Sequence, residues 1–453
     1  MFDNRDTIDF AHTKIPALFR SLFIPTLLGM LFNMAFLLTD GIFIGHGVGP
    51  EGLAVVNLVA PIMMVATGLG MMLGIGGSVV AAIHLSKENV KAARIIVTQA
   101  FWAALAVSVL LGLLYFLFPR TVLSLLGVSK KLMPLALEYY LWFIPTTLLL
   151  LFQIVGEFVI RLDGSPRFAM YSNVIPALVN IGFDYLFIIV FDWDLRGAAL
   201  ATDIGTFVGA AMTFYYMTFK PQTLSFYRLK RTRTSLRLSL RNVGYMTRTG
   251  FSAFVGEFAI SVMMLTGNRA FGSHLGDEGI AAFGVICYLF PLVFMIYNAA
   301  AQSAQPIISF NYGAGNRSRV RQTFRYSLAI SLAFGLFMTL LFVLFAPAVV
   351  AIFLAPDTAS FRLAAVGLPL FATGYVFVSL NISAISYFQS VELSTFATLL
   401  MLCRGVVFLV AAFLLLPPLL GTAGLWLAVP CAEMLTVAAA GLWLLLRKSH
   451  SIQ

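Results

Sequence analysis

Polar side chains that can bind ions stand inside long apolar stretches in the first half of the chain. Asp184 follows Asn180 by one helical turn, and Asp40 follows Asn33 by two turns, so each pair shares a helix face. A carboxylate in such a stretch is costly unless it faces a partner, water or a bound ion, and it is generally functional. The spacing therefore predicts a buried acidic site that takes up a proton or a sodium ion.

Thr202 and Asp203 extend this group from a neighbouring apolar stretch. Counting the rise per residue places them in the same half of the membrane as Asp40 and Asp184. Burial and a second nearby carboxylate both favour the protonated acid near neutral pH. The alternative interpretation is that Asp40 and Asp203 are interfacial residues at helix ends. Pro25 lies in the middle of the Asp40 stretch and removes a backbone hydrogen bond. We expect it to act as a hinge, and a simple packing kink is the alternative.

The second half of the chain carries a different set of ionisable residues. Glu257 lies near the middle of its stretch and has no partner in its own helix, so we interpret it as a cation- or substrate-binding residue. Arg404 and Glu433 lie at similar depths in consecutive stretches, which predicts a buried ion pair with a structural role. Glu157 precedes Arg161 by four residues, a spacing that predicts a local salt bridge.

The elements that position these residues must be membrane helices. Apolar residues make up 60% of the chain and charged residues 11%, and the mean hydropathy is +0.93. Runs such as 100–118, 398–416 and 424–446 reach the roughly 20 residues that cross a bilayer. Only helices or closed barrels satisfy their own backbone hydrogen bonds there, and runs of this length are helical. The composition excludes a soluble domain and predicts an all-α membrane protein.

Turn residues, among them Gly45–Gly52 and Pro417–Pro418, divide the chain into twelve expected transmembrane helices. Their expected ranges are 15–44, 53–84, 94–118, 132–161, 168–191, 196–219, 243–271, 279–311, 321–354, 361–389, 394–416 and 421–446.

Lys and Arg residues gather on the side that holds both termini and the segment 220–242. The positive-inside rule then places both termini in the cytoplasm of a cell inner membrane. The expected parts are a cytoplasmic N-terminus (1–14), an N-terminal six-helix bundle (15–219), a basic cytoplasmic linker (220–242), a C-terminal six-helix bundle (243–446) and a cytoplasmic C-terminus (447–453).

The two bundles are related in sequence. At one constant offset, Gly45, Gly49, Glu51, Gly52 and Ala54 correspond to Gly272, Gly276, Glu278, Gly279 and Ala281. Because each copy holds six helices, both enter the membrane in the same direction, as parallel repeats do. Two such bundles around a central site are typical of an alternating-access transporter.

No motif indicates an enzyme, a metal site or a cofactor. The segment 311–316 is Gly-rich but lacks the strand and the Lys-Ser/Thr of a P-loop, and the five histidines show no ligand spacing. The net charge of +10 requires no nucleic acid, because the basic linker is explained by topology and by contact with membrane lipids.

Several motifs, in this order, resemble the multidrug and toxic compound extrusion (MATE) family. They are Thr39-Asp40-Gly41 with Gly45, Arg161-Leu162-Asp163-Gly164-Ser165-Pro166, Gly197-Ala198-Ala199-Leu200-Ala201-Thr202, and Gln305-Pro306 followed by Asn311-Tyr312-Gly313-Ala314-Gly315-Asn316. The resemblance covers residues 15–446 and is nearest to the DinF-like branch. It implies a coupling site at Asp40, Asn180, Asp184 and Thr202 beside Pro25, with Asn33 in place of the usual amide. Glu257 resembles an acid of the NorM-like branch, whose further acid in helix 10 is missing here.

The expected function is thus a cation-coupled antiporter, coupled to protons or to sodium, that exports amphipathic and often cationic organic compounds. The alternative is a lipid-linked oligosaccharide flippase of the same superfamily. The acidic character of the buried residues disfavours the anionic cargo of such a flippase.

Overall fold

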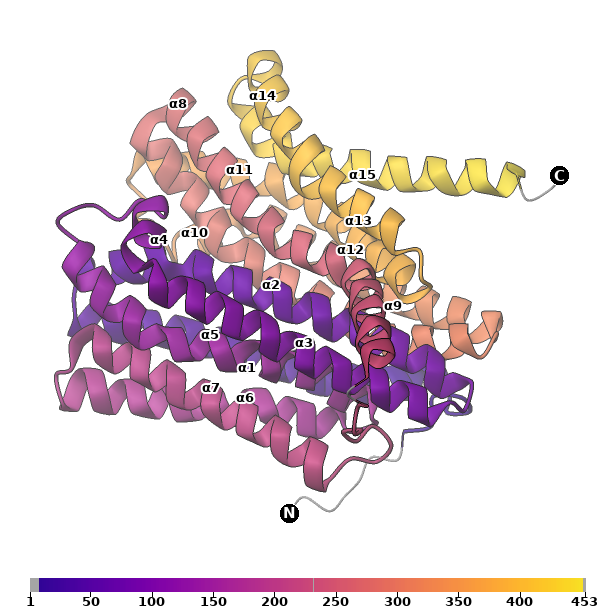
Figure 1. Cartoon of the computed structure of the whole chain (residues 1–453). Helices are drawn as coiled ribbons and strands as arrows, with labels where there is room; N and C mark the ends of the chain where they lie inside the picture. The colour runs from indigo at the N-terminus through magenta and orange to yellow at the C-terminus, as the bar shows by residue number, and fades with distance from the viewer. Residues whose placement is uncertain (1–7, 231, 451–453) are drawn as a thin grey trace. The chain divides into compact units, whose positions relative to one another are not determined.

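The computed structural model describes residues 8–230 and 232–450, and their regular secondary structure is helical throughout (Figure 1). The elements are α1 (Ile15–Gly47), α2 (Pro50–Ser86), α3 (Val90–Leu117), α4 (Pro119–Leu125), α5 (Met133–Leu162), α6 (Pro166–Asp184), η1 (Tyr185–Val190), α7 (Asp194–Phe219), α8 (Arg233–Gly313), α9 (Arg317–Leu344), α10 (Ala346–Val350), α11 (Ala359–Ala372), α12 (Gly374–Ser390), α13 (Ser394–Leu402), η2 (Cys403–Val407), α14 (Phe408–Leu420) and α15 (Thr422–His450). The two η elements are π-helical turns.

The described helices account for twelve membrane spans. Ten are long and apolar enough to cross a bilayer, and the pair α11 and α12, bent by 42°, forms an eleventh. One of the ten, α8, has 81 residues and contains Gly276 with φ 65°, a conformation that ends a helix. At 1.5 Å per residue it is about 120 Å long, enough for two crossings. The predicted all-α membrane fold with twelve helices is confirmed.

Several helix boundaries differ from the prediction, two of them by ten residues. The seventh helix begins at Arg233, ten residues early, because the Thr232 hydroxyl caps it by accepting from the Ser235 amide at 3.2 Å. The ninth ends at Leu344 instead of 354, since Pro347 disfavours helical backbone at the preceding residues. The prolines Pro417 and Pro418 lie inside the last turn of α14, and Gly421, with φ 58°, makes the break.

The chain folds as two compact units. Unit 1 comprises the residues up to Phe254 together with Ser309–Arg317, and unit 2 comprises Val255–Ile308 and the residues from Ser318 onward. In unit 1, α5 packs between α2, α3 and α7, and α1 packs on α6. Small residues permit this closeness, because a Cβ on Gly156 would lie 2.1 Å from the Thr213 side chain.

Unit 2 has an aromatic core where α8, α11, α14 and α15 meet. Phe271 stacks on Phe283 at 4.7 Å and meets Trp426 edge-on at the same distance. Gly367 gives the Trp426 ring its space, since an added Cβ would lie 1.9 Å from it.

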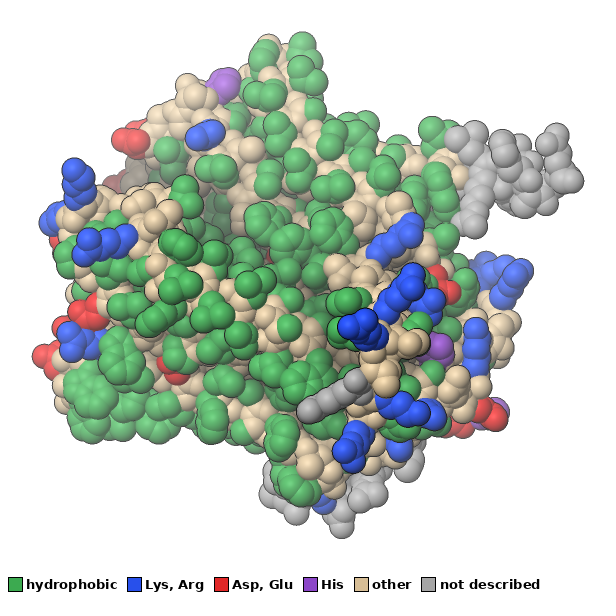
Figure 2. All heavy atoms as spheres, in the orientation of Figure 1, with side chains coloured by type: hydrophobic (Ala, Val, Ile, Leu, Met, Phe, Trp, Pro, Cys, Tyr) green, Lys and Arg blue, Asp and Glu red, His purple; other side chains and the backbone are tan. Residues whose placement is uncertain are grey.

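The surface is apolar along the helices. On the face shown in Figure 2, hydrophobic side chains cover α3, α5 and α7, and Lys and Arg side chains gather toward the helix ends. Leu110 and Phe116 of α3, for example, are more than half exposed. A surface of this kind suits a hydrocarbon environment bordered by polar headgroups.

Candidate functional site

In unit 1, two carboxyl groups meet at the contact between α1 and α6. Asp40 lies two turns before the end of α1, and Asp184 is the last residue of α6. The two side chains lie within hydrogen-bonding reach of each other, and their residues are 8% and 0% exposed. Among the described residues, no other group donates to either oxygen of Asp184 or to Oδ1 of Asp40.

This arrangement restricts the protonation state of the pair. Two adjacent, buried carboxylates repel each other, and three of their oxygens are buried without a donor from the described residues. A proton held between them supplies the missing donor and removes half of the charge. The pair can therefore exchange its proton for another cation without any further protein ligand.

A π-helical turn fixes the position of Asp184. It begins at Tyr185, directly after the aspartate, and closes with a bond from the Phe191 amide to the Leu186 carbonyl at 2.9 Å. A Cβ on Gly47 would lie 2.3 Å from Ile188, and one on Gly197 would lie 2.9 Å from Phe187. These glycines let α1 and α7 close on the turn, and π-turns are frequent at functional sites.

Asn180 and Thr202 form the next layer of the site. The Asn180 amide donates to the Thr202 hydroxyl at 3.4 Å, and that hydroxyl donates to the Ala198 carbonyl at 3.0 Å. Asn180 is buried, yet its Oδ1 has no hydrogen-bond partner. An unpaired amide oxygen one turn below Asp184 is a ready ligand for a cation or a proton-carrying water.

Asp203 belongs to the same bundle interior. Its carboxylate accepts a hydrogen bond from Thr146 of α5. Tyr139, also on α5, is buried within electrostatic range of Asp40, Asp184 and Asp203. Sequence reasoning missed Tyr139, since nothing in its spacing separates it from the other fourteen tyrosines of the chain.

Two predicted residues lie outside this cluster. Asn33 is exposed and forms no hydrogen bond to a described residue, although it shares a helix with Asp40. Pro25 is buried, and α1 continues through it from Ile15 to Gly47. The Thr26 hydroxyl beside it has no hydrogen-bond partner. Pro25 has no amide N–H to donate, so the helix lacks one backbone hydrogen bond at this point.

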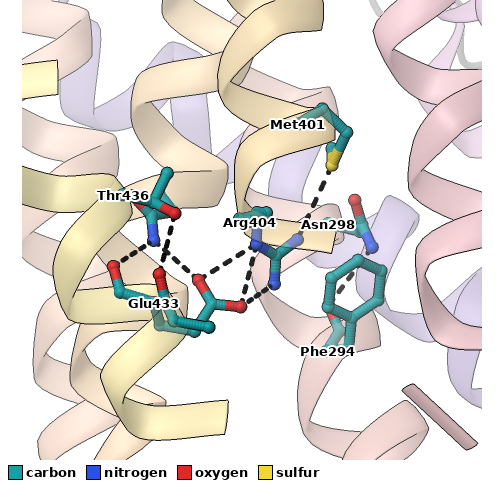
Figure 3. Close-up of polar contacts among 8 residues, drawn as sticks. Phe294, Asn298, Met401, Arg404, Glu433 and Thr436 are labelled. Atoms are coloured by element: carbon teal, nitrogen blue, oxygen red, sulfur yellow. Dashed lines mark hydrogen bonds and ion pairs between the residues drawn. The ribbon is translucent and has the colours of Figure 1, made fainter. Parts of the chain in front are cut away.

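In unit 2, the predicted ion pair of Arg404 and Glu433 is confirmed (Figure 3). The Arg404 Nε donates to both carboxylate oxygens at 2.9 and 3.0 Å, and its Nη2 donates to Oε1 at 2.5 Å. Asn381 of α12 donates to Oε2 at 2.6 Å and to the Glu433 carbonyl at 2.9 Å. Both charged residues are 4% exposed.

The other side of Arg404 faces α8 and Met401. Its guanidinium lies over the Phe294 ring at 5.5 Å, and its Nη1 reaches the Met401 sulfur at 3.8 Å. Figure 3 shows Phe294 and Asn298 on this side, opposite Glu433. Both oxygens of Glu433 thus accept hydrogen bonds from the guanidinium of Arg404, which is a permanent cation, and Oε2 also accepts from Asn381. This cluster is unsuited to cation exchange, unlike the pair in unit 1.

Glu257 stands alone in unit 2. It is half-buried in α8 and forms no hydrogen bond or ion pair to any described residue. The helix that carries it packs on η2, since a Cβ on Gly405 would lie 2.3 Å from Ala259. The predicted salt bridge between Glu157 and Arg161 in unit 1 is confirmed.

Comparisons with known proteins agree with this architecture. The MatE family model matches residues 25–186 and residues 253–414, one segment in each half of the chain. An outward-facing multidrug resistance MATE family transporter of the MOP superfamily, a solved structure, has a TM-score of 0.88 with 22% identity and covers 97% of both chains. That likeness shows the fold.

Two relatives carry functional names. A FAD transporter from Shewanella oneidensis is 25% identical over 326 residues, which cover 71% of this chain and 70% of that protein. The multidrug export protein MepA from Staphylococcus aureus is 22% identical over 427 residues, which cover 92% and 90%. With the family model matching well over half of its residues, this chain belongs to the MatE family of membrane transporters, which are not enzymes.

Proposed function

We propose that this chain is a proton-coupled antiporter that exports amphipathic, often cationic organic compounds by alternating access. The observation that carries the proposal is the buried carboxyl pair of Asp40 and Asp184, which no protein donor satisfies. Such a pair binds a proton or a cation but not both, and this competition is what antiport requires. The names of the relatives, a multidrug export protein and a FAD transporter, support an organic cargo.

The cycle follows from the charge of the pair. A proton that enters from outside neutralises one carboxylate and weakens the attraction for a cationic cargo, so the cargo leaves. A cargo cation that arrives from the cytoplasm displaces the proton and restores the starting state. Because one proton enters for each monovalent cargo cation that leaves, no net charge crosses the membrane and the pH gradient drives the export. Each pH unit supplies about 1.4 kcal/mol, which sustains roughly a tenfold concentration ratio.

Neighbouring residues assist this exchange. The Asn180 oxygen and the Thr202 hydroxyl offer acceptors beside the pair, as in the DinF-like branch of the family. Tyr139 stabilises the ionised state, because its hydroxyl is a donor within electrostatic range of the aspartates. Asp203 is a secondary acid, and Glu257 is an accessory cation or cargo residue in unit 2. Pro25 and Thr26 provide the hinge at which α1 bends when the charge changes.

The orientation in the membrane follows from the distribution of charged residues. The basic segment 220–242 contains no acid, and the positive-inside rule assigns it to the cytoplasm together with both termini. We infer that the protein lies in the inner membrane. The loops around Glu51, Asp192 and Asp277 then lie on the outer side of that membrane.

Ethidium efflux from cells that express the chain tests this function. Wild type is compared with Asp40→Asn and Asp184→Asn, and the exposed Asp357→Asn is the matched control. We expect efflux that a protonophore abolishes, that sodium does not change, and that only the two site variants lose. Sodium-dependent efflux would keep the exporter and replace the ion. Efflux retained by both site variants would move coupling to Glu257, and the absence of efflux for every cation tested would favour the lipid-linked flippase.

A further inference from the structure

The first part of α8 extends beyond its membrane span. From Arg233 to Gly276 the helix is about 65 Å long at 1.5 Å per residue, whereas roughly 30 Å crosses the hydrocarbon. The excess lies at the start, where residues 233–242 alternate between basic, polar and leucine side chains. These turns therefore lie at the level of the lipid headgroups.

One face of these turns is fixed to unit 1. Gln99 of α3 donates to the Ser239 hydroxyl at 2.8 Å, and Asn242 donates to Gln99 at 3.0 Å. Met246 is fully buried one turn later, with its backbone against Gly76 of α2. The opposite face of the helix is consequently turned away from the protein.

That outer face carries a row of three exposed arginines. Arg233, Arg237 and Arg241 follow one another at intervals of four residues and extend over about 12 Å. None of the three forms an ion pair with a described residue, and the sequence contains no Asp or Glu between Asp203 and Glu257. Like charges at this spacing disfavour a helix, so an anion from outside the chain would stabilise these turns.

Exposed leucines flank the arginine row. Leu236 is 64% exposed and Leu240 is 66% exposed, and helical periodicity places both beside the arginines. Figure 2 shows Lys and Arg side chains gathered over the start of α8 with apolar atoms between them. Arginine heads beside apolar side chains are typical of a helix that lies in the membrane interface. A nucleic acid or an acidic protein would leave the leucines in water.

We propose that the arginine row (Arg233, Arg237 and Arg241) binds the headgroups of acidic phospholipids, with Leu236 and Leu240 inserted at the boundary of the acyl chains. The lipid phosphates neutralise the row and hold the start of α8 on unit 1. This site is independent of the proton-coupled transport proposed above, because it involves no residue of the carboxyl pair.

Lipid binding to the purified full chain tests the proposal. The protein in a neutral detergent is titrated with phosphatidylglycerol or with phosphatidylcholine, and bound lipid is counted by native mass spectrometry. The variant is Arg233→Gln, Arg237→Gln and Arg241→Gln combined. The matched control removes three exposed charges elsewhere, as Arg120→Gln, Lys130→Gln and Arg362→Gln.

We expect wild type and control to prefer phosphatidylglycerol, and the variant to bind it about a hundredfold more weakly, or about fivefold for each arginine. Binding of phosphatidylcholine is expected to stay unchanged in all three proteins. Equal loss in the control would show a general effect of net charge and overturn the proposal. An unchanged preference in the variant would overturn it as well, as would short RNA that displaces phosphatidylglycerol only from wild type and control.

Discussion

At the scale of single residues, the two units solve the problem of a buried carboxylate in opposite ways. Glu433 accepts hydrogen bonds from the Arg404 guanidinium and from the Asn381 amide, so protein groups satisfy its carboxyl group. Three oxygens of Asp40 and Asp184 receive no donor from the described residues, and in the proposed cycle a mobile proton supplies it. We propose that the second arrangement exchanges its proton, because coupling one ion to another ligand requires a site whose occupancy changes.

The Arg404–Glu433 pair predicts a strongly non-additive stability effect. Removing one charge, as in Arg404→Met, leaves Glu433 buried without its counter-ion and costs about 3–5 kcal/mol. Removing both, as in Arg404→Met with Glu433→Leu, costs far less, because no uncompensated charge remains. Thermal unfolding of the purified variants measures both effects. Equal loss of stability in the single and double variants would show that packing, and not charge, holds this cluster.

The spacing of polar residues along the chain predicted some members of these two sites and missed others. It paired Asn180 with Asp184 and Arg404 with Glu433, because rare charges in apolar helices leave few partners to consider. Tyr139 and Asn381 were not predicted, since an uncharged polar residue in a membrane helix has many alternative roles. Asn33 shares a helix with Asp40, yet in the structure it is exposed and apart from the pair.

At the scale of elements, glycines set how closely helices approach. Within unit 1, α2 crosses the start of α8 with backbones in contact. A Cβ on Gly76 would lie 2.0 Å from the Met246 carbonyl oxygen, and one on Gly250 would lie 1.8 Å from that of Met72. Two such contacts four residues apart on each helix form one crossing between small residues.

Alanine at either glycine should destabilise unit 1. Gly76→Ala and Gly250→Ala place a methyl group against backbone that cannot rotate away, at a cost of about 1–3 kcal/mol. Gly244→Ala is the control, because its Cβ would meet no atom within 4 Å and the change should stabilise the helix by about 0.5–1 kcal/mol. Melting temperatures of the three variants decide the matter, and a stable Gly76→Ala protein would contradict the close crossing.

A second element, the segment after α7, is anchored by one carboxylate. Asp163 accepts from the amides of Gln222, Thr223 and Leu224 at 2.7–2.8 Å and from the Tyr216 hydroxyl at 2.8 Å. Burial raises the pKa of the Asp163 carboxyl, and these hydrogen bonds oppose that effect. The motif Arg161–Pro166, one of those that resemble the MATE family, thus anchors the segment after α7 through Asp163. The sequence alone did not reveal this structural role.

Loss of this anchor should expose the linker to protease. Asp163→Ala removes four hydrogen bonds to a charged group, and each contributes about 1.5–3 kcal/mol. We expect trypsin to cleave at Arg228 and Lys230, both exposed, at least about tenfold faster than in wild type. The variant Asp163→Asn keeps one acceptor oxygen, so its cleavage rate should fall between those of wild type and Asp163→Ala. Unchanged cleavage in Asp163→Ala would show that other contacts hold the segment.

The helix count was predictable because apolar runs of bilayer length leave no other fold. The helix ends were less so. The start of α8 at Arg233 depends on one capping threonine, and the break at Phe345 depends on a proline that follows it. Both are local hydrogen-bonding effects to which hydropathy is insensitive.

At the scale of the whole molecule, two related halves carry different chemistry. One family model matches both halves, yet the donor-free acid pair occurs in unit 1 and a neutralised pair occurs in unit 2. Sequence repeats report ancestry and fold, whereas the charges of individual side chains decide which half couples to an ion. We therefore expect one half to perform the ion exchange while the other mainly provides structure and cargo contacts.

Proton release on cargo binding tests the central claim most directly. Purified protein in weakly buffered detergent at neutral pH is mixed with ethidium, and the released protons are measured with a pH indicator. If cargo and proton compete for Asp40 and Asp184, wild type and the control Asp357→Asn release protons when they bind ethidium, whereas the double variant Asp40→Asn with Asp184→Asn does not. Proton release that persists in the double aspartate variant, or that is absent in wild type although ethidium binds, would contradict the account.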